Sequence, residues 1–125
     1  MRHILIVEDD HEIRETLKQA VMEVSHCNVT TAEHGGEALK ILNLKTGIDL
    51  ILADIMMPIM DGLEFRQQQL NHPEFKNIPL IFLTANHFLK EKAEALHPYE
   101  FLNKPININD LAKVLENFFL LHPKK

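Results

Sequence analysis

Short apolar segments of the chain end in side chains that can take part in chemistry. These side chains are Glu8 and Asp9, then Asp54, Thr84 and Lys104. The segments before them show no alternation with polar residues, which is typical of strands covered on both faces of a parallel sheet. Because the carboxyl ends of parallel strands meet at one edge of a sheet, we expect these side chains to lie close together.

The expected grouping combines three carboxylates with one nearby cation, Lys104. Two carboxylates about 4 Å apart repel each other by about 4 kcal/mol at an effective dielectric constant of roughly 20. A bound Mg²⁺ would offset this repulsion, since it takes oxygen ligands and is typically held by one or two carboxylates together with a phosphate. We therefore predict a magnesium site with Asp9 and Asp54 as direct ligands and Glu8 as a ligand through water.

The apolar pattern along the chain predicts the strands and helices that would position these residues. Strands are expected over 3–7, 28–32, 48–53, 80–83 and 101–102. Helices are expected from an N-cap at Asp10 to Val24, from a turn at Gly35 and Gly36 through Leu42, over 62–71, over 88–96, and from a cap at Asn107 to Phe118. The core-facing residues of the first helix are expected to be Ile13, Leu17, Val21 and Val24. This alternation predicts a doubly wound α/β fold with a parallel sheet and helices on both of its faces.

Length and composition limit the class of protein. The 125 residues suit one domain, 1–125, and a hydrophobic content of 46% can fill a core. The formal net charge of −5 argues against a protein that binds nucleic acid through a basic surface. Cys27 is the single cysteine, which fits a reducing compartment, and no apolar run has the length of a membrane helix or of a signal peptide core. A cytoplasmic protein without membrane attachment is therefore expected.

Four sequence motifs, taken together, resemble those of one known family. ILIVEDD, LILADIMMPIMDG, IFLTA and FLNKP occur in the order and with the approximate spacing of the receiver domain of bacterial two-component response regulators. Each motif alone is common, but their combination at successive strand ends is specific and covers nearly all of the chain. The resemblance, in particular to single-domain chemotaxis-type receivers, implies a flavodoxin-like fold whose five-stranded parallel sheet has the strand order 2-1-3-4-5.

The resemblance also implies a role for the residues at the strand ends. Asp54 would be the phosphoacceptor, which takes a phosphoryl group from a sensor histidine kinase or a histidine phosphotransfer protein. The backbone carbonyl of Met56 would complete the protein ligands of Mg²⁺ beside the acidic pair. Thr84 would donate a hydrogen bond to a phosphoryl oxygen, and Lys104 would pair with the phosphoryl group. Phe101 would be the aromatic residue whose rotamer is coupled to Thr84.

The chemistry implied by the resemblance has a simple physical basis. A carboxylate is a competent nucleophile, and phosphoryl transfer depends mainly on positioning and on neutralising the charge of the phosphoryl oxygens. The ammonium of Lys104 and a magnesium ion would do this from two sides. Movement of the Thr84 hydroxyl would then bias a two-state element that a downstream protein target recognises. Turnover of an external small molecule is not expected, so the chain is not predicted to be an enzyme.

Several single residues have a second interpretation at this level. Asp54 could cap the helix that follows it, whereas Asp10 is better explained as an N-cap than as a metal ligand. Phe101 is more safely assigned to packing at the edge of the core than to a switch. The 8 histidines show no spacing typical of metal ligands and are expected at the surface. The methionines at positions 56, 57 and 60 are expected to pack in the loop and the core.

Two other functions can be compared with the receiver interpretation. A phosphatase of the haloacid dehalogenase type also uses an aspartate nucleophile with magnesium, but its nucleophile follows the first strand, where this chain has EDD. A receiver-like module that binds proteins without accepting phosphate would have no need of the chemical residues that are present here.

Two segments depart from the family pattern. Receivers usually carry a Gly-Ala-type turn before the fifth strand, where this chain has HPYE at 97–100, and the segment between Thr84 and Lys104 is slightly short. The helix over 88–96 is therefore expected to be abbreviated. A homodimer through the face formed by this helix, the fifth strand and the last helix stays an open alternative.

Two further features bear on partners and on the lifetime of the phosphoryl group. The segment FLL at 119–121 is either an exposed apolar strip for a partner or part of a wide core-facing stripe. Met56 and Asn86 stand two residues after Asp54 and Thr84, where receivers guide the hydrolytic water. An apolar Met56 is expected to slow the loss of the phosphoryl group.

Overall fold

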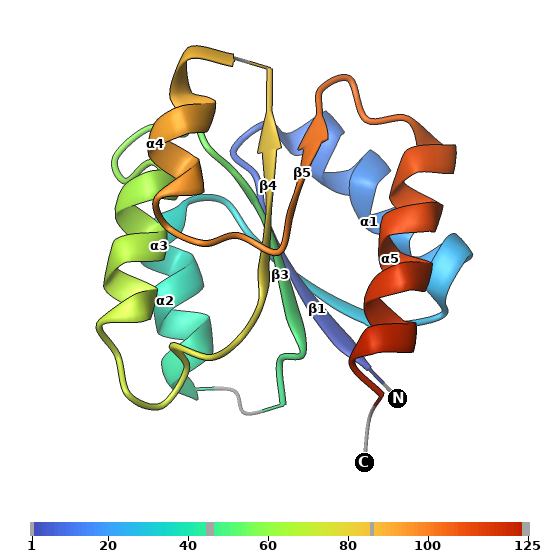
Figure 1. The fold of residues 1–125 in the computed structure, drawn as a ribbon, viewed down its shortest axis with the longest axis horizontal. Coiled ribbons are helices and arrows are strands. Elements are labelled where there is room, and N and C mark those ends of the chain that lie inside the picture. The colour runs from blue at the N-terminus through green and yellow to red at the C-terminus, as the bar shows by residue number, and fades with distance from the viewer. Residues whose placement is uncertain (1, 45–46, 86, 124–125) are drawn as a thin grey trace.

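A parallel β-sheet forms the centre of the molecule. The computed structural model describes residues 2–44, 47–85 and 87–123, and within these residues five strands form the sheet. The strands are β1 (His3–Val7), β2 (Asn28–Ala32), β3 (Leu50–Asp54), β4 (Leu80–Thr84) and β5 (Glu100–Asn103). Their spatial order is β2-β1-β3-β4-β5 and every neighbouring pair is parallel, so the predicted fold class and strand order are confirmed (Figure 1).

Helices cover both faces of this sheet. The α-helices are α1 (His11–Ser25), α2 (Gly35–Leu44), α3 (Gly62–Leu70), α4 (Lys90–Glu94) and α5 (Ile108–Leu121), and a 3-10 helix, η1 (His87–Leu89), precedes α4. Helices α2, α3 and α4 lie on one face, and α1 and α5 lie on the other (Figure 1). Within the described ranges, none of the helices has the length and apolar character needed to cross a membrane.

The sheet separates two apolar cores. One core contains Phe65 of α3 and Phe82 of β4, and the other contains Phe118 of α5. Alternate residues of the central strands serve the two cores, because successive side chains of a strand point to opposite faces. Each fully buried side chain of this size contributes about 1.5–3 kcal/mol, so the central strands are the most strongly held part of the fold.

The ends of α1 and α5 follow the capping signals in the sequence. The side chain of Asp10 accepts a hydrogen bond from the Ile13 amide at 3.0 Å, which confirms Asp10 as an N-cap. The side chain of Asn107 accepts from the Asn109 and Asp110 amides at 2.8 and 3.1 Å. The Lys104–Pro105 peptide bond is cis.

Three details of the sequence interpretation were wrong. Gly35 and Gly36 are the first residues of α2 and not a turn before it, and a Cβ at Gly35 would lie 2.8 Å from the Met60 sulfur, so close packing explains this glycine. Ile13 is 38% exposed because its position on α1 lies beyond the edge of the core. Ile48 is buried, but it precedes β3, which begins at Leu50 and includes Asp54.

The expected helix over 88–96 is much shorter in the structure. It consists of η1 followed by only 5 α-helical residues, and Leu89 at its N-cap makes no capping hydrogen bond through its side chain. His97 then takes a left-handed backbone conformation, with φ of 54°, directly before Pro98. Because neither end carries a strong helix signal, the short spacing noted in the sequence produces an abbreviated α4.

Candidate functional site

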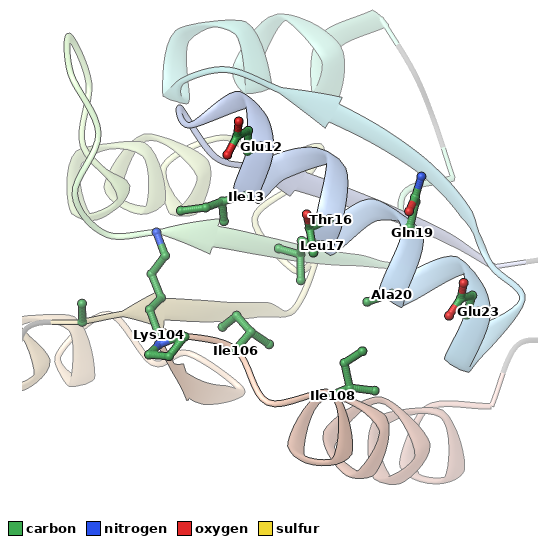
Figure 2. Close-up of a pocket in the computed structure, with 12 residues that line it drawn as sticks. Glu12, Ile13, Thr16, Leu17, Gln19, Ala20, Glu23, Lys104, Ile106 and Ile108 are labelled. Atoms are coloured by element: carbon green, nitrogen blue, oxygen red, sulfur yellow. The ribbon is translucent and has the colours of Figure 1, made fainter.

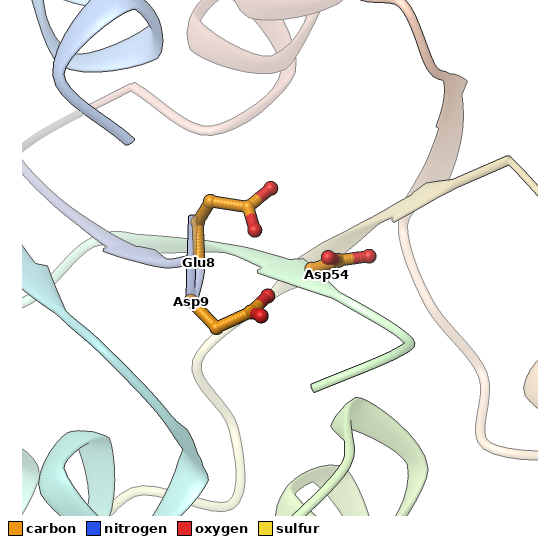
Figure 3. Close-up of side chains that lie close together, drawn as sticks. All are labelled: Glu8, Asp9 and Asp54. Atoms are coloured by element: carbon orange, nitrogen blue, oxygen red, sulfur yellow. The ribbon is translucent and has the colours of Figure 1, made fainter. Parts of the chain in front are cut away.

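The predicted acidic residues meet at the carboxyl edge of the sheet. Glu8 and Asp9 follow β1, and Asp54 is the last residue of β3. Their carboxylate oxygens lie within 4.8 Å of one another and point toward a common space (Figure 3). In the described part of the chain this is the only group of three or more acidic, histidine or cysteine residues with such geometry. Five histidines are exposed, as expected, whereas His3, His34 and His72 are half-buried.

Lys104 forms hydrogen bonds with two of these carboxylates. Its Nζ donates to Glu8 Oε1 at 2.7 Å and to Asp54 Oδ2 at 3.0 Å. Burial lowers the pKa of Lys104, but the hydrogen bonds and charges of Glu8 and Asp54 together outweigh this effect and hold the pKa above its ordinary value. The ammonium is therefore a fixed positive charge beside the Asp54 carboxylate at neutral pH.

The alternation of side chains along the strands explains this triad. Glu8, Asp54 and Lys104 stand two residues beyond Ile6, Leu52 and Leu102, which all face the core under α1 and α5. Thr84 stands two residues beyond Phe82, whose side chain faces the opposite core. Glu8 and Lys104 thus approach Asp54 from one side of the sheet edge, and Thr84 lies on the other side.

The donor atoms fit a hard divalent cation. Three carboxylates and one ammonium leave a formal charge of −2 at this edge. Asp9 is exposed, and desolvation together with a hydrogen bond to the Glu8 side chain raises the pKa of its carboxyl group. A group of oxygen ligands with unbalanced negative charge and one solvent-facing member is the kind of site that Mg²⁺ occupies while keeping part of its water shell.

A pocket of about 260 Å³ contains this chemistry. Its walls include Glu8, Asp9, Asp10, Asp54, Ile55, Met56, Thr84, Ala85 and Lys104. Thr84 is 3% exposed and pairs with Asn103 in the sheet, so its hydroxyl-bearing side chain is held at the pocket wall. The structure therefore brings together all of the predicted phosphoacceptor and metal residues.

Phe101 lies outside this pocket lining. Its ring stacks on Phe82 at 6.0 Å between centroids, and the Lys90 Nζ lies 5.2 Å from its ring centre. It packs half-buried against the core under α2, α3 and α4, so the interpretation of Phe101 as packing at the core edge is confirmed. Phe101 and Thr84 nevertheless share one face of the sheet. Phe101 pairs with Phe82 of the neighbouring strand, and Thr84 stands two residues after Phe82 on the same face of β4.

Gly62 lets the loop after β3 fold against Asp54. Its amide donates to the Ile55 carbonyl at 2.7 Å, and a Cβ at this position would overlap the Asp54 carbonyl oxygen and lie 2.8 Å from the Ile55 Cα. The Met56 amide lies 3.3 Å from Asp54 Oδ1, within hydrogen-bond distance. Met56 is 61% exposed at the rim, so the expectation that its side chain packs was wrong, whereas Met57 is buried and Met60 is half-buried.

One residue that positions the acidic pair was missed in the sequence. Arg14 of α1 is buried, and its Nη1 donates to the carbonyls of Glu8 and Asp9 at 2.9 and 3.4 Å. Its signal was available, since Arg14 occupies the core-facing stripe of α1, three residues before Leu17. A cation in such a stripe needs partners, and here they are backbone carbonyls at a strand end.

A larger groove adjoins the pocket, but none of the carboxylates of the pocket lines it. It has a volume of about 710 Å³ and runs between α1 and the segment from Lys104 to the start of α5, with Ile13, Ile106 and Ile108 in its apolar walls (Figure 2). Lys104 and Ala85 border both cavities. The smaller cavity is the candidate functional site, because the carboxylates, the hydroxyl and the ammonium gather there.

The family to which this site belongs is shown by comparison with known proteins. The family described as Response regulator receiver domain matches residues 4–116. The chain belongs to this family, and the resemblance stated from the sequence motifs is confirmed. Receiver domains are signalling domains of two-component systems.

Curated relatives match most of this chain. The probable transcriptional regulator ycf29 of Porphyra purpurea is 31% identical over 117 residues, which are 92% of this chain and 55% of that protein. The two-component response regulator ARR17 of Arabidopsis thaliana is 30% identical over 125 residues, which are 90% of this chain and 81% of that protein. The chain spans about half the length of the ycf29 proteins of Porphyra purpurea and Pyropia yezoensis.

Solved structures agree with the fold over nearly the whole chain. The chemotaxis protein CheY4 of Vibrio cholerae superposes with a TM-score of 0.84 at 29% identity, over 94% of this chain and 98% of that one. The signal receiver domain of a histidine kinase from Syntrophus aciditrophicus superposes with a TM-score of 0.88 at 28% identity, over 100% of this chain and 95% of that one.

Proposed function

We propose that this chain is a phosphoacceptor that takes a phosphoryl group on Asp54 from a histidine kinase or a histidine phosphotransfer protein. The observation that carries the proposal is the position of Asp54. It ends a buried strand, accepts a hydrogen bond from Lys104 at 3.0 Å, and lies within 4.8 Å of the Glu8 and Asp9 ligand atoms.

In the proposed transfer, an oxygen of the Asp54 carboxylate attacks the phosphorus of a phosphohistidine. A phosphorus–oxygen bond forms while the phosphorus–nitrogen bond breaks, and the imidazole nitrogen of the donor keeps the electron pair. Lys104 releases part of its bonding to Asp54 and donates to a phosphoryl oxygen, which neutralises charge on one side. Thr84 donates its hydroxyl to another phosphoryl oxygen. Arg14 holds the backbone of the acidic pair during this step.

The same pocket is the proposed magnesium site. Asp9 and Asp54 would be direct ligands, the Met56 carbonyl would be a third ligand from the protein, and Glu8 would bind through water. When bound, Mg²⁺ would supply positive charge that neutralises the phosphoryl oxygens. The fit rests on the oxygen donor set and its formal charge of −2.

The proposed output is a change at Thr84 and Phe101. Movement of Thr84 toward the phosphoryl oxygens would open space on the face that it shares with Phe101, whose ring would turn inward from its half-buried position. An almost complete shift between two such states needs about 5.5 kcal/mol of preference for the active state. A downstream protein target would bind the active face and carry out the response to the signal.

The proposal includes the setting in which the chain acts. Residues 1–125 would form one receiver domain in the cytoplasm that works through protein partners and contacts neither nucleic acid nor membrane directly. It would assist its own phosphorylation and dephosphorylation without turning over an external substrate. A homodimer through α4, β5 and α5 is a second mode of output, which the brevity of α4 makes less favourable.

Intact mass spectrometry tests the phosphoacceptor. The protein is incubated with acetyl phosphate and Mg²⁺, and the wild type is compared with Asp54→Asn. The wild type is expected to gain the mass of one phosphoryl group, and the variant is expected to gain none. A mass gain that persists in Asp54→Asn would overturn the assignment of the site, and no gain in either protein would favour a module that only binds partners.

The competing phosphatase function has its own readout. A haloacid-dehalogenase-type enzyme releases phosphate from a small ester over many turnovers, whereas a receiver is labelled once and then loses the label slowly. Phosphate release that continues well beyond one equivalent of protein would support the phosphatase.

A further inference from the structure

A buried arginine without an acidic partner lies on the side of the molecule away from the acidic pocket. Arg66 of α3 is 5% exposed, and burial lowers its pKa. Across the described ranges, no carboxylate comes within ion-pair distance of its guanidinium. A buried cation is costly unless its donors are satisfied, so the hydrogen-bond partners of Arg66 define what it does.

Those partners are backbone carbonyls of the turn between α4 and β5. Arg66 Nε donates to the Leu96 carbonyl at 3.1 Å, and Nη2 donates to the His97 carbonyl at 3.0 Å. Its Nη1 donates to the side chain of Gln69 at 2.8 Å and lies 3.3 Å from the Ile78 carbonyl. Arg66 therefore joins α3 to the end of α4 and to the segment before β4.

The turn that Arg66 holds is also the start of β5. The Leu96 and His97 amides close the last turns of α4 on Ala93 and Glu94 at 3.0 and 3.1 Å. The Tyr99 amide then donates to the Leu80 carbonyl at 2.7 Å, which joins the turn to β4. A helix of 5 residues is too short to be stable by itself, so the position of α4 depends on this turn.

We infer that Arg66 is a positioning residue for the switch: it holds the α4–β5 turn in place, so that the backbone response to phosphorylation is confined to η1 and α4. This inference rests on the proposed phosphoacceptor function. Motion that begins at Thr84 meets a fixed point at Leu96 and His97, and the backbone of β5 keeps its register while the side chain of Phe101 turns. The guanidinium is suited to this role because its planar set of donors reaches two consecutive carbonyls at once.

Amide hydrogen exchange measured by NMR tests the inference. The reporters are the Leu96, His97 and Tyr99 amides, and their rates are divided by those of amides in β3 to remove any change in global stability. In Arg66→Met this ratio is expected to rise about tenfold or more, because the carbonyls lose charge-assisted partners. Arg14→Met is the matched control, since it removes another buried arginine that donates to carbonyls elsewhere, and its ratio is expected to stay within about twofold of the wild type.

A second arm adds Mg²⁺ and beryllofluoride, which mimics a phosphoryl group on a carboxylate. In the wild type the three reporter rates are expected to stay within about twofold of the free protein while the amides of α4 change. In Arg66→Met the response is expected to spread into the reporters, and Arg66→Lys, which keeps the charge but not the planar donors, is expected to fall between the two.

Two results would overturn the inference. One is an unchanged reporter ratio in Arg66→Met, and the other is a response of the wild-type reporters as large as that of α4. Failure of the proposed function is seen separately, as the absence of a mass gain on Asp54, and the ligand-free comparison still tests Arg66 in that case.

Discussion

Lys104 determines the charge balance of the pocket, because its ammonium bonds to both Glu8 and Asp54. Its pKa in the folded protein lies above the ordinary value of 10.5. The stabilisation from this pairing is therefore fully present below pH 10.5 and is lost as the pH rises through the folded pKa.

We expect Lys104→Met to lower the stability of the metal-free protein at pH 7 by about 1–3 kcal/mol, since two carboxylates lose their partner. The difference from the wild type should shrink as the pH rises above the ordinary lysine range. Thermal unfolding across this range measures it. Lys113→Met, which removes an exposed lysine of α5, serves as the control, and an equal pH dependence in both variants would contradict the assignment.

Asp9 contributes a pH dependence of the same sign, but at neutral pH its charge destabilises the fold. Its folded pKa is raised above 3.8, so ionised Asp9 costs stability at neutral pH, and this cost disappears as the pH falls toward 3.8. Without metal, Asp9→Asn is expected to raise the melting temperature at pH 7 by roughly 1–3 °C, a small value because the side chain is exposed to solvent. Addition of Mg²⁺ should stabilise the wild type more than the variant. A lower melting temperature of Asp9→Asn at pH 7 would refute this linkage.

The lifetime of the phosphoryl group is expected to depend on Met56. Its side chain is 61% exposed at the rim of the pocket and offers no hydrogen bond to an attacking water. Met56→Asn is therefore expected to shorten the phosphoryl half-life several-fold, which decay of the phosphorylated mass would measure. Equal half-lives would remove this explanation. The other residue expected on the water path, Asn86, lies outside the described residues.

Residues at strand ends could be predicted from the sequence, and the stripe of α1 signalled the burial of Arg14, but the bonding partners of the buried arginines could not be predicted. Glu8, Asp54 and Lys104 follow apolar strands, so parallel topology alone brings them together. Most partners of Arg14 and Arg66 are backbone carbonyls, which carry no side-chain signature in the sequence. Their roles follow only from the three-dimensional arrangement.

Among the elements, the loop from β3 to α3 imposes the strictest steric requirement. We expect Gly62→Ala to displace this loop from Asp54, because a Cβ would overlap the Asp54 carbonyl oxygen. Phosphorylation by acetyl phosphate should slow about tenfold or more, since small displacements of reacting groups are costly.

Gly36→Ala provides the control for this change. A Cβ at Gly36 meets only the His34 ring at 3.3 Å, and alanine favours the helix, so the stability is expected to rise slightly with an unchanged phosphorylation rate. If acetyl phosphate phosphorylates Gly62→Ala at the wild-type rate, the loop can move without affecting Asp54.

The accuracy of the element prediction varied with the strength of the local signals. Strands β1 and β2 matched their predicted bounds, and α1 begins after the expected cap at Asp10. The expected abbreviation of α4 is confirmed, although the predicted bounds of 88–96 were too long because its N-cap residue Leu89 makes no capping hydrogen bond through its side chain. Each of the two interpretations of the segment at 119–121 applies to part of it. Phe119 packs half-buried beneath Arg2, whereas Leu120 and Leu121 are 73% and 71% exposed.

At the scale of the whole molecule, the two cores share the central strands. Truncation in either core should therefore destabilise the entire domain: Phe65→Ala and Phe118→Ala are each expected to cost about 3–5 kcal/mol. Chemical denaturation followed by circular dichroism and by amide NMR signals should give coincident transitions. Leu120→Ala is the exposed control and should change stability by less than about 0.5 kcal/mol. Separate transitions for the two faces would contradict the shared-sheet description.

The fold class was predictable from the pattern of apolar segments, whereas the strand order was implied by the family resemblance. Five apolar runs alternating with helical segments leave a doubly wound sheet as the arrangement that buries both faces. The conformation of the connecting segments, by contrast, depends on contacts between residues distant in sequence, such as those of Arg66 with Leu96 and His97.

The composition of the chain gives the α4–β5 turn an optical property of its own. The protein has one tyrosine and no tryptophan, and Tyr99 packs edge-on against Phe118 at 5.1 Å and close to the His122 ring. Near-ultraviolet emission therefore comes mainly from a single fluorophore beside the residues that Arg66 holds. Unlabelled protein can report the mobility of that turn through tyrosine anisotropy, whereas ion binding at the distant acidic edge needs calorimetry or a paramagnetic substitute such as Mn²⁺.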